Sequence, residues 1–134
     1  MIKVEHIGIA VKNLERSNQL FEALLGVEKY KIEPVSSEKV NTSFFAVGDT
    51  KIELLESTDK DSPISRFLEK RGEGIHHLAF EVDDIRETLT NLAEKGFELI
   101  SNEPKKGADN KLVAFVHPRS TNGILVEICQ EIRD

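Results

Sequence analysis

The stretch that decides the fold occurs twice in this chain. Residues 4–11 read Val-Glu-His-Ile-Gly-Ile-Ala-Val, and residues 75–82 read Ile-His-His-Leu-Ala-Phe-Glu-Val, so that His6 is matched by His77. After the matched histidine, the residues on the opposite strand face are apolar in both copies: Ile7, Ile9 and Val11 in the first, and Leu78, Phe80 and Val82 in the second. This alternation is typical of a β-strand that buries one face. The chain therefore contains two similar copies of one strand.

An amphipathic helix is expected after each copy of this strand. Asn13 is a suitable N-cap for a helix that runs to about Leu25, and Asp84 begins the matching helix, which ends at Gly96. Three short strands are expected after each helix. They lie near 28–33, 40–47 and 50–56 in the first copy, and near 97–100, 112–117 and 124–130 in the second.

Each copy is thus a βαβββ module, and the sequence predicts an α+β protein with a single domain, 1–134. Module 1 spans about 1–57, and module 2 spans about 74–134. The linker between them, 58–73, carries a short helix that begins at Ser62 and Pro63. We expect the two modules to form a curved mixed sheet around a metal site.

The composition narrows the possible functions. With 39% hydrophobic and 31% charged residues, the 134-residue chain has the make-up of one globular domain. The net charge of −6 argues against nucleic acid as the main partner. No apolar run is long enough to span a membrane, and the first residues show no signal-peptide pattern. Cys129 is the single cysteine, which excludes an intramolecular disulfide and favours a cytoplasmic location.

Four residues at matched positions of the repeat are candidate metal ligands: His6, Glu53, His77 and Glu127. Each histidine lies on the strand face that is not apolar, beside a small residue that leaves room for a ligand. Each glutamate stands inside an apolar strand, where a carboxylate is costly unless it is paired or bound to a metal. Two imidazoles and two carboxylates suit one divalent ion such as Co, Mn, Ni or Zn. The alternatives are hydrogen-bonded strand histidines and edge-strand acids that reach solvent.

The remaining candidates have simpler interpretations. His76 points to the opposite side of its strand from His77, so we expect it to support the fold or the ligands rather than bind a metal. His117 precedes Pro118 at a strand end and is expected in a turn. Cys129 shares a strand face with Glu127 and is expected to fill space in the core rather than act as a nucleophile.

Several runs carry a family resemblance when they are taken in order. They read His-Ile-Gly-Ile-Ala-Val at 6–11, Thr-Lys-Ile-Glu-Leu-Leu-Glu at 50–56, Gly-Glu-Gly-Ile-His-His-Leu-Ala-Phe-Glu-Val-Asp at 72–83, and Gly-Ile-Leu-Val-Glu at 123–127. With the βαβββ duplication, they resemble the methylmalonyl-CoA epimerase family of the vicinal oxygen chelate superfamily, which includes the glyoxalases. The resemblance covers essentially the whole chain. It implies one divalent metal on the same four residues, a coenzyme A thioester substrate and a homodimer.

The resemblance also implies a reaction, the epimerisation of methylmalonyl-CoA by abstraction of its α-proton through a metal-stabilised enolate. Glu127 is the candidate for one acid/base. Family members often place the second at the position of Thr42, which is a poor base. The second group therefore stays open between the nearby candidate Glu38 and a water held by Thr42. The candidates for contacts with the coenzyme A phosphates are Lys105, Lys106 and Arg119.

Two other functions fit the same residues. Glyoxalase I uses a metal and a carboxylate base in the same way, so the four ligands do not separate it from an epimerase, whereas the runs outside the ligands favour the epimerase. A non-catalytic binding protein of the same fold is the third possibility. Such proteins commonly lack a complete ligand set, so the presence of all four candidates counts against it.

Overall fold

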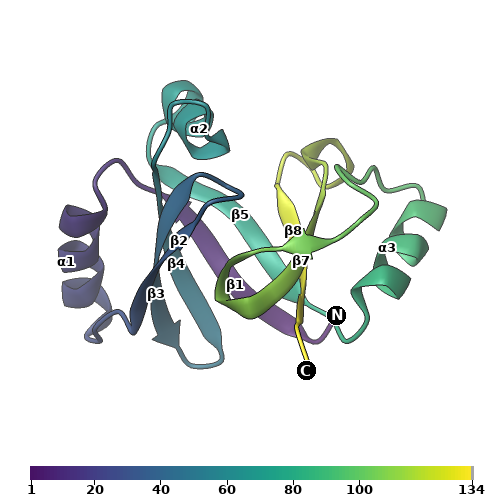
Figure 1. Cartoon of the computed structure of the whole chain (residues 1–134), viewed down its shortest axis with the longest axis horizontal. Helices are drawn as coiled ribbons and strands as arrows, with labels where there is room; N and C mark the ends of the chain where they lie inside the picture. The colour runs from purple at the N-terminus through teal and green to yellow at the C-terminus, as the bar shows by residue number, and fades with distance from the viewer. Residues whose placement is uncertain (134) are drawn as a thin grey trace. The chain divides into compact units, whose positions relative to one another are not determined.

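The computed structural model of the chain describes residues 1–133 (Figure 1). The elements are β1 (Lys3–Ala10), α1 (Leu14–Leu25), β2 (Lys31–Val35), β3 (Val40–Val47), β4 (Thr50–Ser57), α2 (Pro63–Arg71), β5 (Gly74–Glu81), α3 (Ile85–Glu94), β6 (Lys105–Lys106), β7 (Lys111–Val116) and β8 (Val126–Glu131), with short 3-10 turns at Ala108–Asn110 and Pro118–Ser120. No helix within residues 1–133 has both the length and the apolar character to cross a membrane. The chain divides into two compact units. One is residues 6–76, and the other combines residues 1–5 with the chain from His77 onward.

In the unit of residues 6–76 the strand order is β2-β3-β4-β1. β3 and β4 are antiparallel, and β1 runs parallel to β4, with Ile9 opposite Leu54. Helix α1 lies alongside β3 and β4 (Figure 1). It packs through Leu14 on a buried cluster that contains Val11, Phe45 and Leu54. The core of this unit therefore lies between α1 and one face of the sheet.

The other unit repeats this arrangement with the strand order β5-β8-β7-β6. β5 runs parallel to β8, with Ala79 opposite Glu127, and β7 is antiparallel to β8. Ile85 and Leu89 of α3 are buried in a cluster with Ile128 of β8. The predicted α+β class and the βαβββ order of each module are confirmed.

The predicted helix starts are also confirmed. The Asn13 side chain accepts a hydrogen bond from the Arg16 N–H at 3.0 Å, and the Asp84 side chain accepts one from the Glu87 N–H at 3.1 Å. These bonds satisfy backbone donors that have no partner inside a helix. The linker helix α2 begins as expected, with Ser62 as its N-cap.

The prediction of a strand near 97–100 is wrong. Leu99 forms a single bridge to Val116, and the strand that pairs with β7 is the later β6. Phe97 and Leu99 pack against the core below α3. Ser101 then accepts a hydrogen bond from the Glu103 N–H at 3.3 Å, which turns the chain away from further pairing. The apolar pattern here reflects packing against the core rather than a ladder of hydrogen bonds.

The strand predicted near 28–33 forms three residues later, as β2. The Lys29 N–H donates to the Glu22 carboxylate at 3.3 Å, so this part of the chain is still tied to α1. Regular pairing with β3 starts only at Lys31, which lies opposite Phe44.

Replacing Leu89 by alanine should lower the free energy of unfolding by roughly 2–5 kcal/mol, because this side chain is 3% exposed and its loss leaves a cavity. The matched control is Leu24→Ala on α1, where the side chain is 72% exposed and we expect a change below about 0.5 kcal/mol. Urea unfolding followed by circular dichroism measures both values. Equal effects of the two substitutions would contradict this description of the core.

Candidate metal ligands and their surroundings

The first candidate pair, His6 and Glu53, lies in the unit of residues 6–76. His6 comes from β1 and Glu53 from the parallel strand β4, where the glutamate lies opposite Gly8. The His6 Nδ1 lies 3.1 Å from the Glu53 Oε2, and both side chains are buried. They occupy the sheet face opposite the one that α1 covers.

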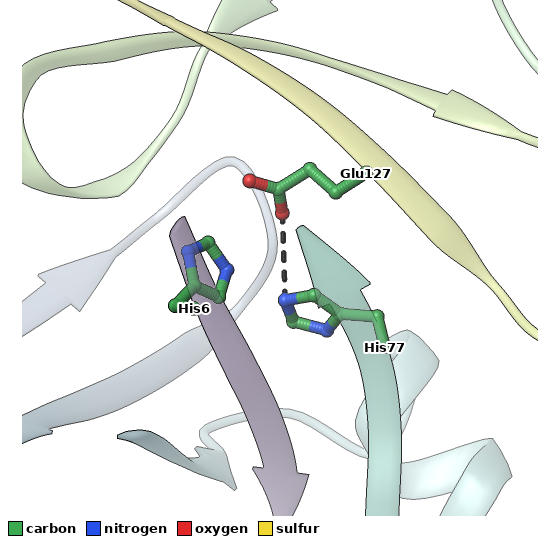
Figure 2. Close-up of side chains that lie close together, drawn as sticks. All are labelled: His6, His77 and Glu127. Carbon is green, nitrogen blue, oxygen red and sulfur yellow. Dashed lines mark ion pairs between the residues drawn. The ribbon is translucent and has the colours of Figure 1, made fainter. Parts of the chain in front are cut away.

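The second candidate pair, His77 and Glu127, repeats this arrangement in the other unit. Figure 2 shows His77 on β5 and Glu127 on β8, with a dashed line between the imidazole and the carboxylate. The His77 Nε2 lies 3.4 Å from the Glu127 Oε1, and both residues are buried. Glu127 lies opposite Ala79, two residues beyond His77, just as Glu53 lies opposite Gly8, two residues beyond His6. The two pairs therefore occupy the same register.

Burial distinguishes the two interpretations of the glutamates, as metal ligands or as edge-strand acids that reach solvent. Glu53 is 4% exposed and Glu127 is 6% exposed, so neither is an edge-strand acid that reaches solvent. A carboxylate removed from water needs a compensating partner, and each has an imidazole nitrogen within reach. Each pair offers one nitrogen and one oxygen ligand with atoms less than 4.8 Å apart. Nitrogen and oxygen donors of this kind suit a first-row divalent ion.

His76 has a supporting role in the fold, as expected. Its ring meets the Phe67 ring of α2 edge-on, with 5.1 Å between the centroids. Desolvation by burial lowers the pKa of His76 from 6.5 to about 4. The ring is therefore neutral at physiological pH and packs as part of the contact between β5 and α2.

The other predicted residues lie as follows. His117 is in a turn, as expected, where its Nδ1 accepts a hydrogen bond from the Arg119 N–H at 3.0 Å. Arg119 is exposed and pairs with Glu98 at 2.8 Å. The candidate contacts of the coenzyme A phosphates on β6, Lys105 and Lys106, are also exposed.

The two residues considered for the second proton transfer lie in and before β3. Thr42 is buried on β3, two residues from Phe44, which lies opposite Glu53. Glu38 is half-buried in the turn between β2 and β3, and its carbonyl oxygen accepts a hydrogen bond from the Ser62 hydroxyl at 3.3 Å.

Cys129 fills space in the core, as expected. It is buried in a cluster with Ala79 and Val113. Burial is the main cause that raises the pKa of the Cys129 thiol, and the nearby carboxylates of Glu127 and Glu5 add to it. A thiol held protonated in this way is a poor nucleophile.

Two buried charged residues near Cys129 were not among the predicted residues. Glu5 is 1% exposed, and Lys111 is 6% exposed with its ammonium 3.7 Å from Glu131. Both influence the Cys129 thiol, with opposite signs. Glu5 shares a strand face with Ile7 and Ile9, and this alternation is the sequence signal that could have indicated its burial.

Comparison with known proteins relates the chain to one superfamily. A family model described as Glyoxalase/Bleomycin resistance protein/Dioxygenase superfamily matches residues 5–115. The chain is 42% identical to an uncharacterized protein of Bacillus subtilis over 97% of this chain and 93% of that protein. It is 40% identical to the ethylmalonyl-CoA/methylmalonyl-CoA epimerase of Cereibacter sphaeroides, over 96% of this chain and 97% of that enzyme.

A solved structure gives the same relationship. The methylmalonyl-CoA epimerase of Streptomyces coelicolor, in complex with 2-nitronate-propionyl-CoA, superposes with a TM-score of 0.92 at 28% identity. The superposition covers 98% of this chain and 95% of that one.

The lowered pKa of His76 predicts a pH-dependent stability. Folding favours the neutral ring, so its contribution is complete above about pH 6.5 and is lost as the pH falls from 6.5 towards 4. Wild-type protein should therefore lose more stability across this range than a His76→Leu variant. Urea unfolding at several pH values, with a chelator present, measures the difference. Parallel pH curves for the two proteins would rule out this role of His76.

Proposed function

The chain belongs to the methylmalonyl-CoA epimerase family of the glyoxalase superfamily, and we propose that it interconverts the two epimers of methylmalonyl-CoA. The observation that carries this proposal is the buried histidine–glutamate pair that recurs in the same register of both units. Two of the relatives described above, those of Cereibacter sphaeroides and Streptomyces coelicolor, are named as epimerases of acyl-CoA substrates. The repeated pair supplies the polar groups that such chemistry needs.

We further propose that His6, Glu53, His77 and Glu127 together hold one divalent ion, Co, Mn, Ni or Zn. Their donor set supports this assignment, because two imidazole nitrogens and two carboxylates form a mixed set that first-row metals accept. Burial supports it as well, since a cation compensates for two carboxylates that are removed from water. When bound, such an ion supplies a Lewis acid that polarises the thioester carbonyl and makes the α-hydrogen more acidic.

The protein residues have to move the proton. Glu127 is the proposed acid/base, with its carboxylate accepting the α-proton and returning it. The apolar cluster of Ala79, Val113 and Cys129 is buried on the same sheet face and keeps water from that carboxylate. Epimerisation needs access to both faces of the α-carbon, so either a second proton-transfer group or one mobile group is required. Glu38 is the proposed candidate, because Thr42 has only a hydroxyl to offer.

The proposed substrate carries the phosphates of coenzyme A, which need cationic partners. Lys105 and Lys106 on β6 are exposed, and so is Arg119. Arg119 already pairs with Glu98, so a phosphate would compete with that carboxylate. The homodimer and the cytoplasmic location stay predictions, from the resemblance and from the cysteine content.

Glyoxalase I remains the alternative that uses the same four ligands. The names of the relatives favour the epimerase. A non-catalytic binding protein is disfavoured because both units keep a buried pair of potential ligands.

Incubating the protein with a single epimer of methylmalonyl-CoA in deuterated water tests the function directly. We expect deuterium to enter at the α-carbon while the other epimer appears. Proton NMR measures the deuterium incorporation, and chiral analysis of the acyl group measures the other epimer. The same preparation is assayed with the methylglyoxal–glutathione adduct, where we expect no lactoylglutathione. Turnover of the adduct with no exchange on methylmalonyl-CoA would reassign the chain to glyoxalase I.

Replacing His77 by alanine should remove both the metal and the activity. Turnover should fall by more than about a hundredfold, since the loss of even an outer-shell partner costs about 10–100-fold in such sites. The matched control is His117→Ala, which removes an imidazole from a turn and should keep the metal and the activity. Metal content by mass spectrometry and folding by circular dichroism are measured on both variants. A His77→Ala protein that keeps a full equivalent of metal would exclude His77 as a ligand.

A further inference from the structure

The sheet of the unit of residues 6–76 has two faces. Helix α1 covers one of them, and His6 and Glu53 project from the other, which we call the ligand face. Residues that lie opposite each other on neighbouring strands share a face, so Phe44 of β3, opposite Glu53, belongs to the ligand face. Lys31 of the edge strand β2 lies opposite Phe44. Lys31 and Glu33, two residues further on, therefore project from the ligand face as well.

Glu33 is a carboxylate of the ligand face that has no assigned function. Within the described strands of residues 6–76, the register places two carboxylates on this face, Glu53 and Glu33. Glu53 is a proposed metal ligand. The side chain of Glu33 is 33% exposed, so a bound molecule can reach its carboxylate. Strand spacing and rise put the two Cα atoms about 12 Å apart, which leaves room for a small acyl group between the side chains.

Lys31 directs the Glu33 carboxylate towards Glu53. The Lys31 Nζ lies 3.2 Å from the Glu33 Oε1, and it also lies over the Phe44 ring, 4.7 Å from the ring centroid. Phe44 is 0% exposed and lies opposite Glu53, so the ring is a fixed platform beside that glutamate. A cation over an aromatic face is held there by electrostatic attraction. The carboxylate that pairs with this ammonium therefore leans along the ligand face and not away from it.

Glu38, the candidate considered above for the second proton transfer, is less suited to reach a substrate. It lies in the turn between β2 and β3, outside the strand ladder that carries the ligand face. Its Oε1 is sealed from solvent, and so is the hydroxyl oxygen of Thr42. Glu33 lies directly opposite Thr42, but its longer side chain ends in an accessible carboxylate. Access to a bound substrate thus favours Glu33 over both.

We propose that Glu33 is the second proton-transfer group of the epimerisation. This assignment rests on the proposed function, in which Glu127 is the first group. Glu33 accepts the α-proton of one epimer, the electron pair of the C–H bond passes to the thioester oxygen, and Glu127 donates a proton to the opposite side of the α-carbon. The two carboxylates exchange these roles for the other epimer. Because Glu33 is partly exposed, it exchanges its proton with water between turnovers.

Isotope exchange by a Glu33→Gln variant tests the proposal. Each epimer of methylmalonyl-CoA is incubated separately with the metal-loaded wild type or variant in deuterated water. Epimerisation by the variant should fall by at least about a hundredfold, since a general base contributes about 10²–10⁴-fold. Glu127 still acts alone, so one epimer should take up deuterium and keep its configuration. The other epimer should exchange no faster than without protein. A structural role of Glu33 would slow the exchange of both epimers equally.

Two measurements show that the variant is otherwise intact. Its metal content by mass spectrometry and its unfolding midpoint in urea should match those of the wild type, because Glu33 is not a proposed ligand and its side chain is partly exposed. The matched control is Glu15→Gln, which removes an exposed carboxylate from α1, on the other side of the same sheet. This control should epimerise at the wild-type rate.

The outcomes separate this assignment from the proposed function. A wild type that neither epimerises methylmalonyl-CoA nor exchanges its α-proton would overturn both. With an active wild type, the Glu33 assignment alone is overturned by normal epimerisation in Glu33→Gln, by equal loss of exchange for both epimers, or by loss of metal or fold in that variant. A Glu38→Gln variant that loses epimerisation while Glu33→Gln keeps it would return the role to Glu38.

Discussion

Parallel pairing between the first and last strands of each module is the constraint on which the rest of the structure depends. β1 pairs with β4 and β5 pairs with β8 in this way. Parallel neighbours need a long crossover, and a helix in that crossover covers one face of the sheet. The apolar residues of the strands are drawn to that face. The histidine and the glutamate of each pair are thereby left together on the other face.

The same pairing makes the buried charges mutually dependent. Glu53 and Glu127 are held away from water by their position in a central strand, and only a neighbouring strand can bring a partner to them. A histidine two residues before the opposite position meets that need in both units. Removing either member of a pair leaves the other as an uncompensated buried polar group. This accounts for the recurrence of the whole pair rather than of single residues.

Much of the fold, and the placing of each candidate histidine on a strand, could be predicted because they depend on local patterns. The alternation around His6 and His77 and the caps Asn13 and Asp84 are visible in short windows of sequence, and the structure confirms what they predict. The residues near Leu99 misled the prediction because their apolar character serves the core and not a strand ladder.

The buried polar residues could not be predicted for a different reason. Asn18 stands on a helix between Ser17 and Gln19, and Lys111 follows Asn110 at the start of a strand, yet both are buried. Their burial follows from tertiary contacts, which no short window records. Only the comparison of two copies of one module shows that Asn18 takes the place of a core leucine.

The single thiol of the chain is also a built-in reporter of local opening. Cys129 is 0% exposed, lies on the same strand face as Glu127, and is held in the protonated form that reacts slowly. A thiol reagent can therefore modify it only when β8 separates from its neighbours. The rate of labelling measures how often the sheet around Glu127 opens locally, and no engineered probe is needed.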